Sequence, residues 1–405
     1  ASQDYGRWFA KYHESDLEIF IRRDRNHACV IMWSIGNEVT GATVEMTNKL
    51  VGLVHKWDSS RSVTCGIQGT GKVSDDCRAA LDIAGYNDGG GACFIYERDY
   101  AARPLQLMVA TESPHTYQTR GFYRTRTWWR DKNQPRKEIE NLTEKEVFTD
   151  GCEFYHSSYD NAGVRLNARD CWEMTASLPY LIGEFRWTGF DYYGESLNWP
   201  ARNVGNGLID TANIPKDHYY LYQAMWVEPE IRPVLHILPH WTHDLPEETK
   251  IPVYVYTNCE ETELFLNENS LGKQKVQQGC FALYQIPYRR GKLTAKAYYQ
   301  GKCVKEAMNR TAGGPSGIRL YQLMGDIKKR PNEPVEIRAV VVDDYGTEVL
   351  YAQNPILFLG DGMEIIGTEN GDHVDLTPLT SHVRRTFYGK CMVLAKAKEY
   401  QNVYE

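Results

Sequence analysis

Two glutamates end apolar, strand-like runs, and together they could cleave a glycosidic bond. Glu38 follows the run VIMWSIGN (30–37), and Glu112 ends the run LQLMVATE (105–112). If both runs are strands of one parallel sheet, their carboxyl ends meet at one mouth, where α/β barrels carry catalytic groups. Two carboxyl groups about 5 Å apart suit retaining glycoside hydrolysis: one protonates the leaving oxygen and the other attacks the anomeric carbon. Taken alone, either glutamate is better explained as an ordinary turn residue.

The first 228 residues alternate short apolar runs with helical stretches, a pattern that indicates βα units. Continuously apolar runs are typical of parallel strands covered on both faces. The expected strands are 30–37, 62–67, 81–87, 105–112 and 181–187, and helices are expected over 4–23 and 43–58. The long polar segment 117–180 is expected to be an elaborated loop with some helix, on the side where active-site loops belong. The predicted fold class of this part is α/β with a parallel sheet.

After residue 230 the pattern changes to alternating strands separated by turn signals about every 8 to 12 residues, as in all-β sandwiches. The stretch TAGGPSG (311–317) is typical of a linker between two such modules. We therefore predict three domains: 1–228, then an Ig-like β-sandwich over 229–312, then a second Ig-like β-sandwich over 313–405 that is incomplete at its end.

The composition excludes several classes of partner. The 405 residues carry a formal net charge of −7 and no basic block, so no nucleic-acid partner is expected. Apolar runs stay shorter than about 18 residues, so no membrane span is expected. Ten cysteines without a C-x-x-C pair mildly favour a cytoplasmic address, which stays open. His236, His240 and His243 have ligand-like spacing, but Pro239 interrupts them; we expect structural histidines, and neither a metal nor a cofactor.

Four motifs in order resemble glycoside hydrolase family 2, the group of β-galactosidases, β-glucuronidases and β-mannosidases. NHACVIMWSIGNE (26–38) is similar to its acid/base signature, with Ala28-Cys29 where the family usually shows Pro-Ser. ATES (110–113) resembles the nucleophile strand of β-galactosidase-like members, LDIAGYN the strand two before it, and GEFRWTGFDYYGE (183–195) the final barrel strand. The resemblance covers essentially the whole chain and implies the C-terminal part of a (β/α)8 TIM barrel followed by Ig-like modules.

The resemblance also implies roles for individual residues. Glu38 would be the proton donor and Glu112 the nucleophile, and Asn37 would bind the sugar 2-hydroxyl, an interaction that strengthens in the transition state. The activity expected is that of a retaining exo-β-glycosidase acting on an oligosaccharide or glycoside. A non-catalytic carbohydrate-binding or scaffolding protein is the alternative from another class, and a homo-oligomer is left open.

Three further residues are expected around the sugar. By the same resemblance, Tyr86 and Asn87 would line the mouth, with Tyr86 holding Glu112, and Trp187 would form the floor. Side chains alternate along a strand, so Glu184 points away from Trp187 and is expected to be structural, packed between sheet and helices. In the loop beyond, Asp191 and Glu195 remain candidate substrate contacts.

One departure from the family narrows the substrate. The glucuronidases of the family that this chain resembles carry an Asn-x-Lys motif shortly after the final strand, which binds the sugar carboxylate. The matching stretch here is Gly205-Asn206-Gly207-Leu208, without the lysine. A neutral sugar is therefore expected, and galactose is preferred on the likeness to β-galactosidases. β-Glucuronidase and β-mannosidase activities are the alternatives within the family.

The number of strands predicts that this chain is part of a larger unit. A family barrel has eight strands, and the run ending at Asn37 resembles the fourth, which leaves five in this chain. We expect a fragment that lacks the N-terminal modules and the first three barrel strands; completion by a second polypeptide is the alternative. An open sheet would expose an apolar edge, so the chain alone is expected to be inactive.

Overall fold

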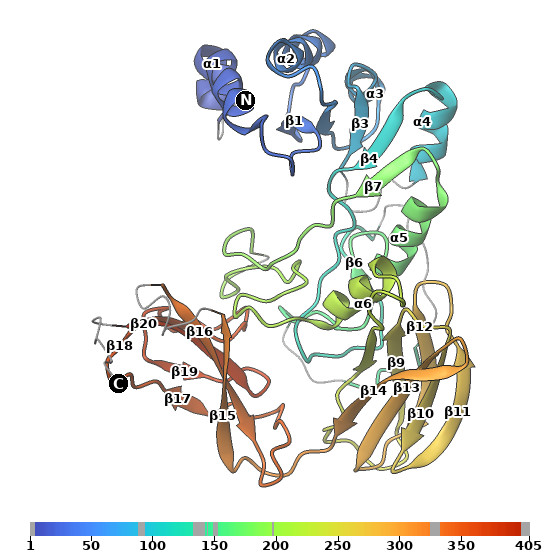
Figure 1. Ribbon diagram of the computed structural model, residues 1–405, viewed down its shortest axis with the longest axis vertical. Coiled ribbons are helices and arrows are strands. Elements are labelled where there is room, and N and C mark those ends of the chain that lie inside the picture. The colour runs from blue at the N-terminus through green and yellow to red at the C-terminus, as the bar shows by residue number, and fades with distance from the viewer. Residues whose placement is uncertain are drawn as a thin grey trace. The chain divides into compact units, whose positions relative to one another are not determined.

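The computed structural model describes residues 5–87, 94–132, 142–143, 145–148, 153–196, 198–324 and 333–397. The chain divides into two compact units (Figure 1). The first unit comprises Ala1–Thr116, Trp129–Glu138 and Gly163–Trp187, and the second comprises Tyr117–Trp128, Ile139–Ala162 and Thr188–Glu405. Each unit is described by itself.

The first unit is built on five parallel strands. They are β1 (Trp33–Asn37), β2 (Val63–Gly66), β3 (Ile83–Tyr86), β4 (Leu107–Ala110) and β7 (Leu181–Glu184). β1 pairs with β2, β3 with β4, and β4 with β7, all in parallel. A parallel bridge between Ile67 and Tyr86 joins β2 to β3. The strands therefore follow one another in chain order, as in a segment of a βα barrel, and all five sequence-predicted strands are confirmed.

Helices connect these strands. They are α1 (Gly6–Asp24), α2 (Val44–Trp57), α3 (Lys72–Ala79), α4 (Tyr96–Ala102) and α5 (Ala168–Ser177). The two predicted helices are confirmed as α1 and α2. The side chain of Thr43 caps α2 by accepting from Met46 N at 3.2 Å, and that of Asn167 caps α5 by accepting from Asp170 N at 2.8 Å. These caps fix where the two helices begin after their loops.

Two apolar clusters pack the strands against the helices. One joins Ile21 of α1, Trp33 of β1 and Val54 of α2, and the other joins Tyr86, Tyr96, Met108 and Cys171 with their neighbours. β2 and β3 are buried along their whole length, which explains their continuously apolar sequences. One face of each strand is therefore committed to the helices, and the residues at the strand ends are left to form a site.

Within its described residues, the long segment between β4 and β7 contains little regular structure before α5, as predicted. Its described strands are the two-residue β5 (Trp128–Trp129) and β6 (Ala162–Gly163). The chain passes between the two units within this segment.

The second unit contains α6 (Asp217–Trp226) and antiparallel strands, so the predicted change to an all-β pattern is confirmed. The first group is β8 (Leu235–Leu238), β9 (Lys250–Thr257), β10 (Glu261–Leu266), β11 (Asn269–Lys275), β12 (Phe281–Pro287), β13 (Lys292–Tyr299) and β14 (Lys302–Arg310). It forms a four-stranded sheet, β11-β10-β13-β14, and a three-stranded sheet, β12-β9-β8, around a core that includes Trp241.

The second group of strands follows the TAGGPSG stretch. It consists of β15 (Gly317–Met324), β16 (Val335–Val342), β17 (Pro355–Leu357), β18 (Met363–Glu369), β19 (Val383–Arg385) and β20 (Lys390–Ala397). These form a four-stranded sheet, β15-β16-β20-β18, and a two-stranded sheet, β17-β19. The Ig-like topology and the domain limits at 228 and 312 stay predictions.

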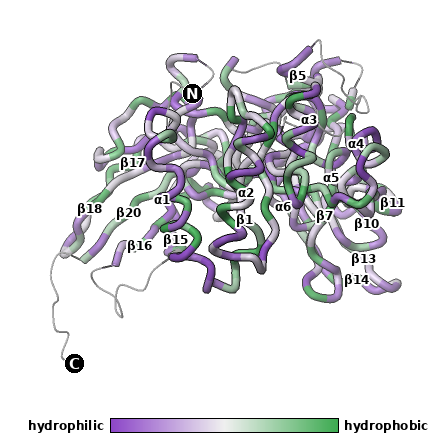
Figure 2. Tube along the Cα trace, turned by 90° about the horizontal axis from the view of Figure 1, so that it is seen from above, coloured by the Kyte–Doolittle hydropathy of each residue, from purple (hydrophilic) through white to green (hydrophobic). Residues whose placement is uncertain are grey.

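Hydrophobic and hydrophilic residues alternate along the elements of both units rather than gathering in one long apolar segment (Figure 2). Within the described ranges, no helix is both long and apolar enough to cross a membrane.

Candidate active site

One side-chain amide, that of Asn87 just after β3, joins the ends of β1 and β4. Its Nδ2 lies 2.5 Å from Oε2 of Glu112, 2.7 Å from Oδ1 of Asn37 and 3.2 Å from Oε1 of Glu38. Because both carboxylates contact one nitrogen, these two oxygens lie less than about 6 Å apart, near the separation of about 5–5.5 Å at which retaining glycosidases hold their pair. Of the sequence-predicted site residues, Asn37, Glu38, Asn87 and Glu112 therefore come together.

Thr111 fixes the orientation of that amide. Its hydroxyl donates to Oδ1 of Asn87 at 2.7 Å, so the opposite end, Nδ2, faces the carboxylates. An amide has two N–H groups, and three acceptors lie within reach of this one. The two shorter hydrogen bonds from Nδ2 go to Glu112 and Asn37, and the contact with Glu38 is longer. The amide thus holds Glu112 more firmly than it holds Glu38.

A glycine beneath the site makes this approach feasible. A Cβ added to Gly66, at the end of β2, would lie 2.5 Å from Oδ1 of Asn37 and 2.7 Å from Oδ1 of Asn87. The Gly66 carbonyl also accepts from Glu38 N at 2.7 Å, and Glu38 has a positive φ of 47°. That left-handed conformation is uncommon for a glutamate and turns the chain sharply at the strand end. Gly66 therefore supports both Asn37 and Glu38.

His115 lies beside Glu112 and is not among the site residues predicted from the sequence. Its Nε2 is 3.2 Å from Oε1 of Glu112, and its ring centroid is 6.2 Å from that of Trp187, at an interplanar angle of 37°. His115 also forms a parallel bridge with Trp187. Trp187 is thus placed next to the group that contacts the proposed nucleophile. The signal in the sequence is a histidine three positions after Glu112, directly after Pro114.

The role predicted for Tyr86 is corrected. Its side chain is buried on the helix side of β3, and its hydroxyl donates to Oδ2 of Asp99 on α4 at 2.9 Å. Burial is the main cause that raises the pKa of Tyr86, followed by the Asp99 charge. Successive residues of a strand point to opposite faces, so Tyr86 and Asn87 cannot both face the mouth. Asn87 holds Glu112 instead.

Glu184 on β7 faces the helices, as predicted. Its Oε2 accepts from the Thr175 hydroxyl of α5 at 2.8 Å. Burial raises the pKa of Glu184 to about 7, against the opposing effect of that hydrogen bond. Glu184 is thus tied to the helix that covers its strand by a threonine hydroxyl.

Asp191, in the second unit, is not available to a substrate, which corrects the prediction for it. It is buried, and its carboxylate lies 2.7 Å from Nζ of Lys216 and accepts from Gly207 N at 2.7 Å. Burial, partly offset by Lys216, raises the pKa of Asp191 to about 6. Glu195 is exposed and accepts a hydrogen bond from the Tyr192 hydroxyl.

The stretch that replaces the Asn-x-Lys motif also lies in the second unit. Leu208, two positions after Asn206, is buried, and its N–H donates to Thr188 O at 3.2 Å and to Gly189 O at 3.0 Å. The position at which a uronate-binding lysine was sought is therefore packed into the protein.

The three histidines with ligand-like spacing do not converge. His236 pairs with Asp217 at 2.6 Å, while His240 and His243 stack on each other with ring centroids 4.5 Å apart. Across the described part of the chain, no group of three or more histidine, cysteine, aspartate or glutamate side chains could hold a metal ion.

The sheet is parallel and alternates with helices, and two carboxylates are bridged at the carboxyl ends of its strands. These features place the chain among α/β proteins with a barrel-type candidate active site. Family models agree with this: residues 2–90 match the TIM barrel domain of glycosyl hydrolases family 2, and residues 318–403 match glycoside hydrolase family 2 C-terminal domain 5. Residues 248–305 match a domain of unknown function, DUF4982. The chain belongs to glycoside hydrolase family 2.

Individual relatives point the same way. A putative beta-glucuronidase of Formosa agariphila is 37% identical over 98% of this chain and 39% of its own length. The beta-galactosidase BoGH2A of Bacteroides ovatus is 32% identical over 97% of this chain and 49% of its own length. The crystal structure of a beta-glycosidase from Bacteroides vulgatus matches with a TM-score of 0.90 and 41% identity, over 98% of this chain and 51% of that one. The chain thus spans about half or less of the length of these relatives.

Proposed function

We propose that the protein containing this chain is a retaining exo-β-glycosidase, in which Glu112 is the nucleophile and Glu38 the acid/base. The observation that carries the proposal is the Asn87 bridge, which holds both carboxylates within hydrogen-bond distance of one nitrogen. That separation leaves room for one anomeric carbon between the two groups and is too short for an intervening water, as an inverting enzyme would need.

The proposed reaction has two steps. In the first, a Glu112 oxygen attacks the anomeric carbon while Glu38 gives its proton to the departing glycosidic oxygen, which leaves a glycosyl ester on Glu112. In the second, Glu38 takes a proton from water, the water oxygen attacks the same carbon, and the Glu112 carboxylate departs. Glu38 is thereby reprotonated, and the sugar is released with its original anomeric configuration.

The contacts around the pair support this division of roles. Glu112 has a hydrogen-bonding neighbour at each oxygen, Asn87 at Oε2 and His115 at Oε1, so its position is fixed before substrate arrives. A nucleophile benefits from such fixed geometry. Asn37 uses Oδ1 to accept from Asn87, which leaves its amide nitrogen to donate to the sugar 2-hydroxyl. Trp187, next to His115, provides the floor proposed for the sugar.

For the substrate we propose a neutral β-linked sugar, with galactose first. The buried Leu208 at the position where a uronate-binding lysine was sought supports a neutral sugar, and the Bacteroides ovatus relative named a beta-galactosidase supports galactose. β-Glucuronidase is the second candidate, because the Formosa agariphila relative carries that name. The presence of both carboxylates in one bridged pair argues against a purely carbohydrate-binding role.

The decisive experiment is labelling with 2-fluoro glycosides of galacto, glucurono and manno configuration, applied to the protein that contains this chain. Peptide mapping is expected to find a galactosyl label on the peptide that carries Glu112, and the Glu112→Gln variant should stay unlabelled. A label on the Glu184 peptide would overturn the assigned roles, and a label only from the glucurono reagent would overturn the substrate.

A further inference from the structure

A cavity lies wholly within the second unit. Its volume is about 470 Å³, in the range of about 300–1,000 Å³ typical of small-molecule sites. The residues that matter here are Tyr155, Asn370, Asp372, Arg385, Phe387 and Tyr388, which all line it. None of these takes part in the proposed chemistry.

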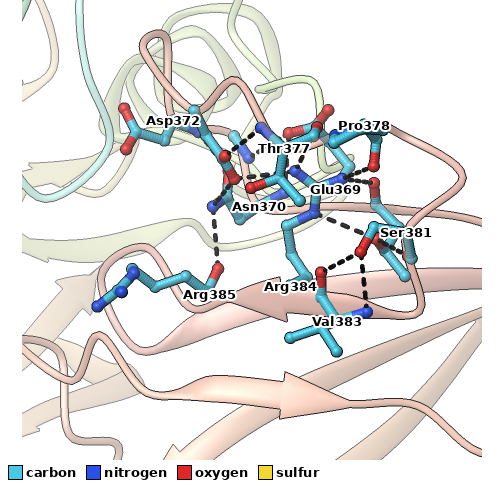
Figure 3. Close-up of polar contacts among 12 residues, drawn as sticks. Glu369, Asn370, Asp372, Thr377, Pro378, Ser381, Val383, Arg384 and Arg385 are labelled. Atoms are coloured by element: carbon cyan, nitrogen blue, oxygen red, sulfur yellow. Dashed lines mark hydrogen bonds and ion pairs between the residues drawn. The ribbon is translucent and has the colours of Figure 1, made fainter.

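The wall of this cavity is held in place by a dense set of hydrogen bonds (Figure 3). Asn370 donates from Nδ2 to Asp375 Oδ2 at 2.8 Å and to Arg385 O at 2.9 Å, and its Oδ1 accepts from Asp372 N at 2.9 Å. The fully buried Arg384 donates to Asp375 Oδ2 at 2.9 Å and to Pro378 O at 2.8 Å. The loop after β18 is therefore fixed before any ligand arrives, which lowers the entropy cost of binding.

Acceptor and donor groups project from this wall on one side. The Asp372 carboxylate and the Arg385 side chain extend in the same direction, with Asn370 between them (Figure 3). Asp372 Oδ1 accepts from the Tyr155 hydroxyl at 2.7 Å and from Val374 N at 3.1 Å. Among the described residues, Oδ2 of Asp372 has no hydrogen-bond partner. Arg385 donates from Nη1 to Gln353 O at 3.2 Å and has other N–H groups left.

Aromatic rings form the apolar part of the lining. The ring centroids of Tyr155 and Phe387 lie 5.6 Å apart, and those of Phe387 and Tyr388 lie 5.0 Å apart. Tyrosine rings offer an apolar face together with a hydroxyl, and that combination suits a ligand with C–H faces and many hydroxyls. Rings, a carboxylate and a guanidinium thus line one cavity.

The charges argue against an ionic ligand. Asp375 is already neutralised by Arg384, which leaves Asp372 as the single carboxylate offered to the cavity, too few for a hard cation that takes six or more oxygens. An anion would be attracted by Arg385 but repelled by Asp372. A neutral ligand with many hydroxyls can accept from Arg385 and donate to Asp372 at once.

We propose that this cavity is a non-catalytic binding site for a neutral oligosaccharide. It would retain a glycan on the protein through residues other than the catalytic pair. The inference stands apart from the roles of Glu38 and Glu112, because it rests on other residues and needs no turnover.

The test uses the Glu112→Gln variant of the protein that contains this chain, so that the sugar is not consumed. Hydrogen–deuterium exchange is followed with lactose and with cellobiose at millimolar concentration. At least one disaccharide is expected to protect peptides that cover 370–388. Protection of only the peptides that contain Asn37 and Glu112, or none, would overturn the site, as would protection of 370–388 by calcium chloride or sodium phosphate alone.

Variants locate the binding. Asp372→Asn and Arg385→Gln should each weaken the disaccharide affinity measured through the 370–388 peptides by about tenfold, the loss expected from one charge-assisted hydrogen bond. Tyr388→Phe keeps the ring and should weaken it less. Asp361→Asn, an exposed aspartate that does not line the cavity, is the matched control and should leave the affinity unchanged. Equal effects of Asp372→Asn and Asp361→Asn would overturn the proposal.

Discussion

The amide nitrogen of Asn87 lies 2.5 Å from Oε2 of Glu112, closer than it lies to Asn37 or Glu38. Asn87 directly follows β3 and Glu112 follows β4, so this contact joins neighbouring strands at their carboxyl ends. A hydrogen-bond donor at the proposed nucleophile can orient the carboxylate. It stays in contact with that oxygen while the negative charge of the carboxylate decreases during the first step. The contact therefore links the sheet register directly to the proposed chemistry.

Replacing Asn87 tests that link. Asn87→Ala removes the donor, and we expect kcat to fall about 10²- to 10³-fold, the usual loss for one preorganised donor. Asn87→Asp places a like charge beside Glu112, so protonation of Glu112 becomes easier and the acidic limb of the pH–rate profile should move to higher pH. Steady-state kinetics on aryl β-galactosides would measure both. Asn269→Asp, at an exposed position in β11, is the control, and an equal shift there would refute the argument.

Gly66 gives a prediction that separates positioning from stability. In Gly66→Ala the new Cβ would lie 2.5 Å from Oδ1 of Asn37, so the Asn37–Asn87 contact has to open. We expect a loss of activity of at least about tenfold with a folded protein, because the strain falls on two site side chains. The matched variant is Gly52→Ala inside α2, where a Cβ meets nothing within 4 Å.

The Gly52→Ala variant should keep full activity and gain about 0.5–1 kcal/mol in unfolding free energy, since alanine is the better helix former. Thermal unfolding followed by circular dichroism, with kinetics on the same samples, measures both variants. Equal activity in the two would mean that Gly66 does not position the site.

The sequence was sufficient to predict where the strands end, and hence to pair Glu38 with Glu112. Strand ends are marked locally, by a continuous apolar run and then a polar residue. The face to which each side chain points is harder to predict, because a shift of one residue reverses it. For this reason the prediction that Tyr86 holds Glu112 is wrong, and the neighbouring Asn87 makes that contact.

Other features depend on partners distant in sequence. Asp191 is neutralised by Lys216, 25 positions later, and nothing near Asp191 indicates that pairing. Gly66 matters only because Asn37 and Asn87 close over it from two other strands. Glu184 was predicted correctly because strand alternation from Trp187 needs no distant information.

Buried histidines predict acid sensitivity of the second unit. Burial lowers the pKa of His156 to about 4, below the ordinary value of 6.5. Between these pH values the unfolded chain binds more protons than the folded chain. The contribution of His156 to the unfolding free energy is therefore fully present above about pH 6.5 and is lost as the pH drops towards 4. The loss from this one group is about 1.4 kcal/mol per pH unit.

The thermal midpoint of the second unit at pH 7 and at pH 5 measures this sensitivity. His156→Asn should reduce the difference between the two midpoints, whereas His382→Asn, at an exposed position, should not. An undiminished difference in His156→Asn would show that the histidine does not contribute.

The same substitution at two strands separates the proposed nucleophile from the structural carboxylate. Glu112→Gln removes the attacking group and should lower kcat by several orders of magnitude, without unfolding the protein. Glu184→Gln keeps the shape of a side chain that contacts Thr175 on α5, so activity should stay within about threefold of the unmodified protein.

Glu184 also predicts a pH dependence of stability, because its pKa is raised from 4.5 to about 7 in the folded protein. Between these values the folded chain holds a proton that the unfolded chain has lost, so the contribution of Glu184 to the unfolding free energy declines as the pH rises from about 4.5 to 7. Glu184→Gln should therefore be relatively more stable than the unmodified protein at pH 8 than at pH 5, and a large loss of activity in it would contradict the assignment.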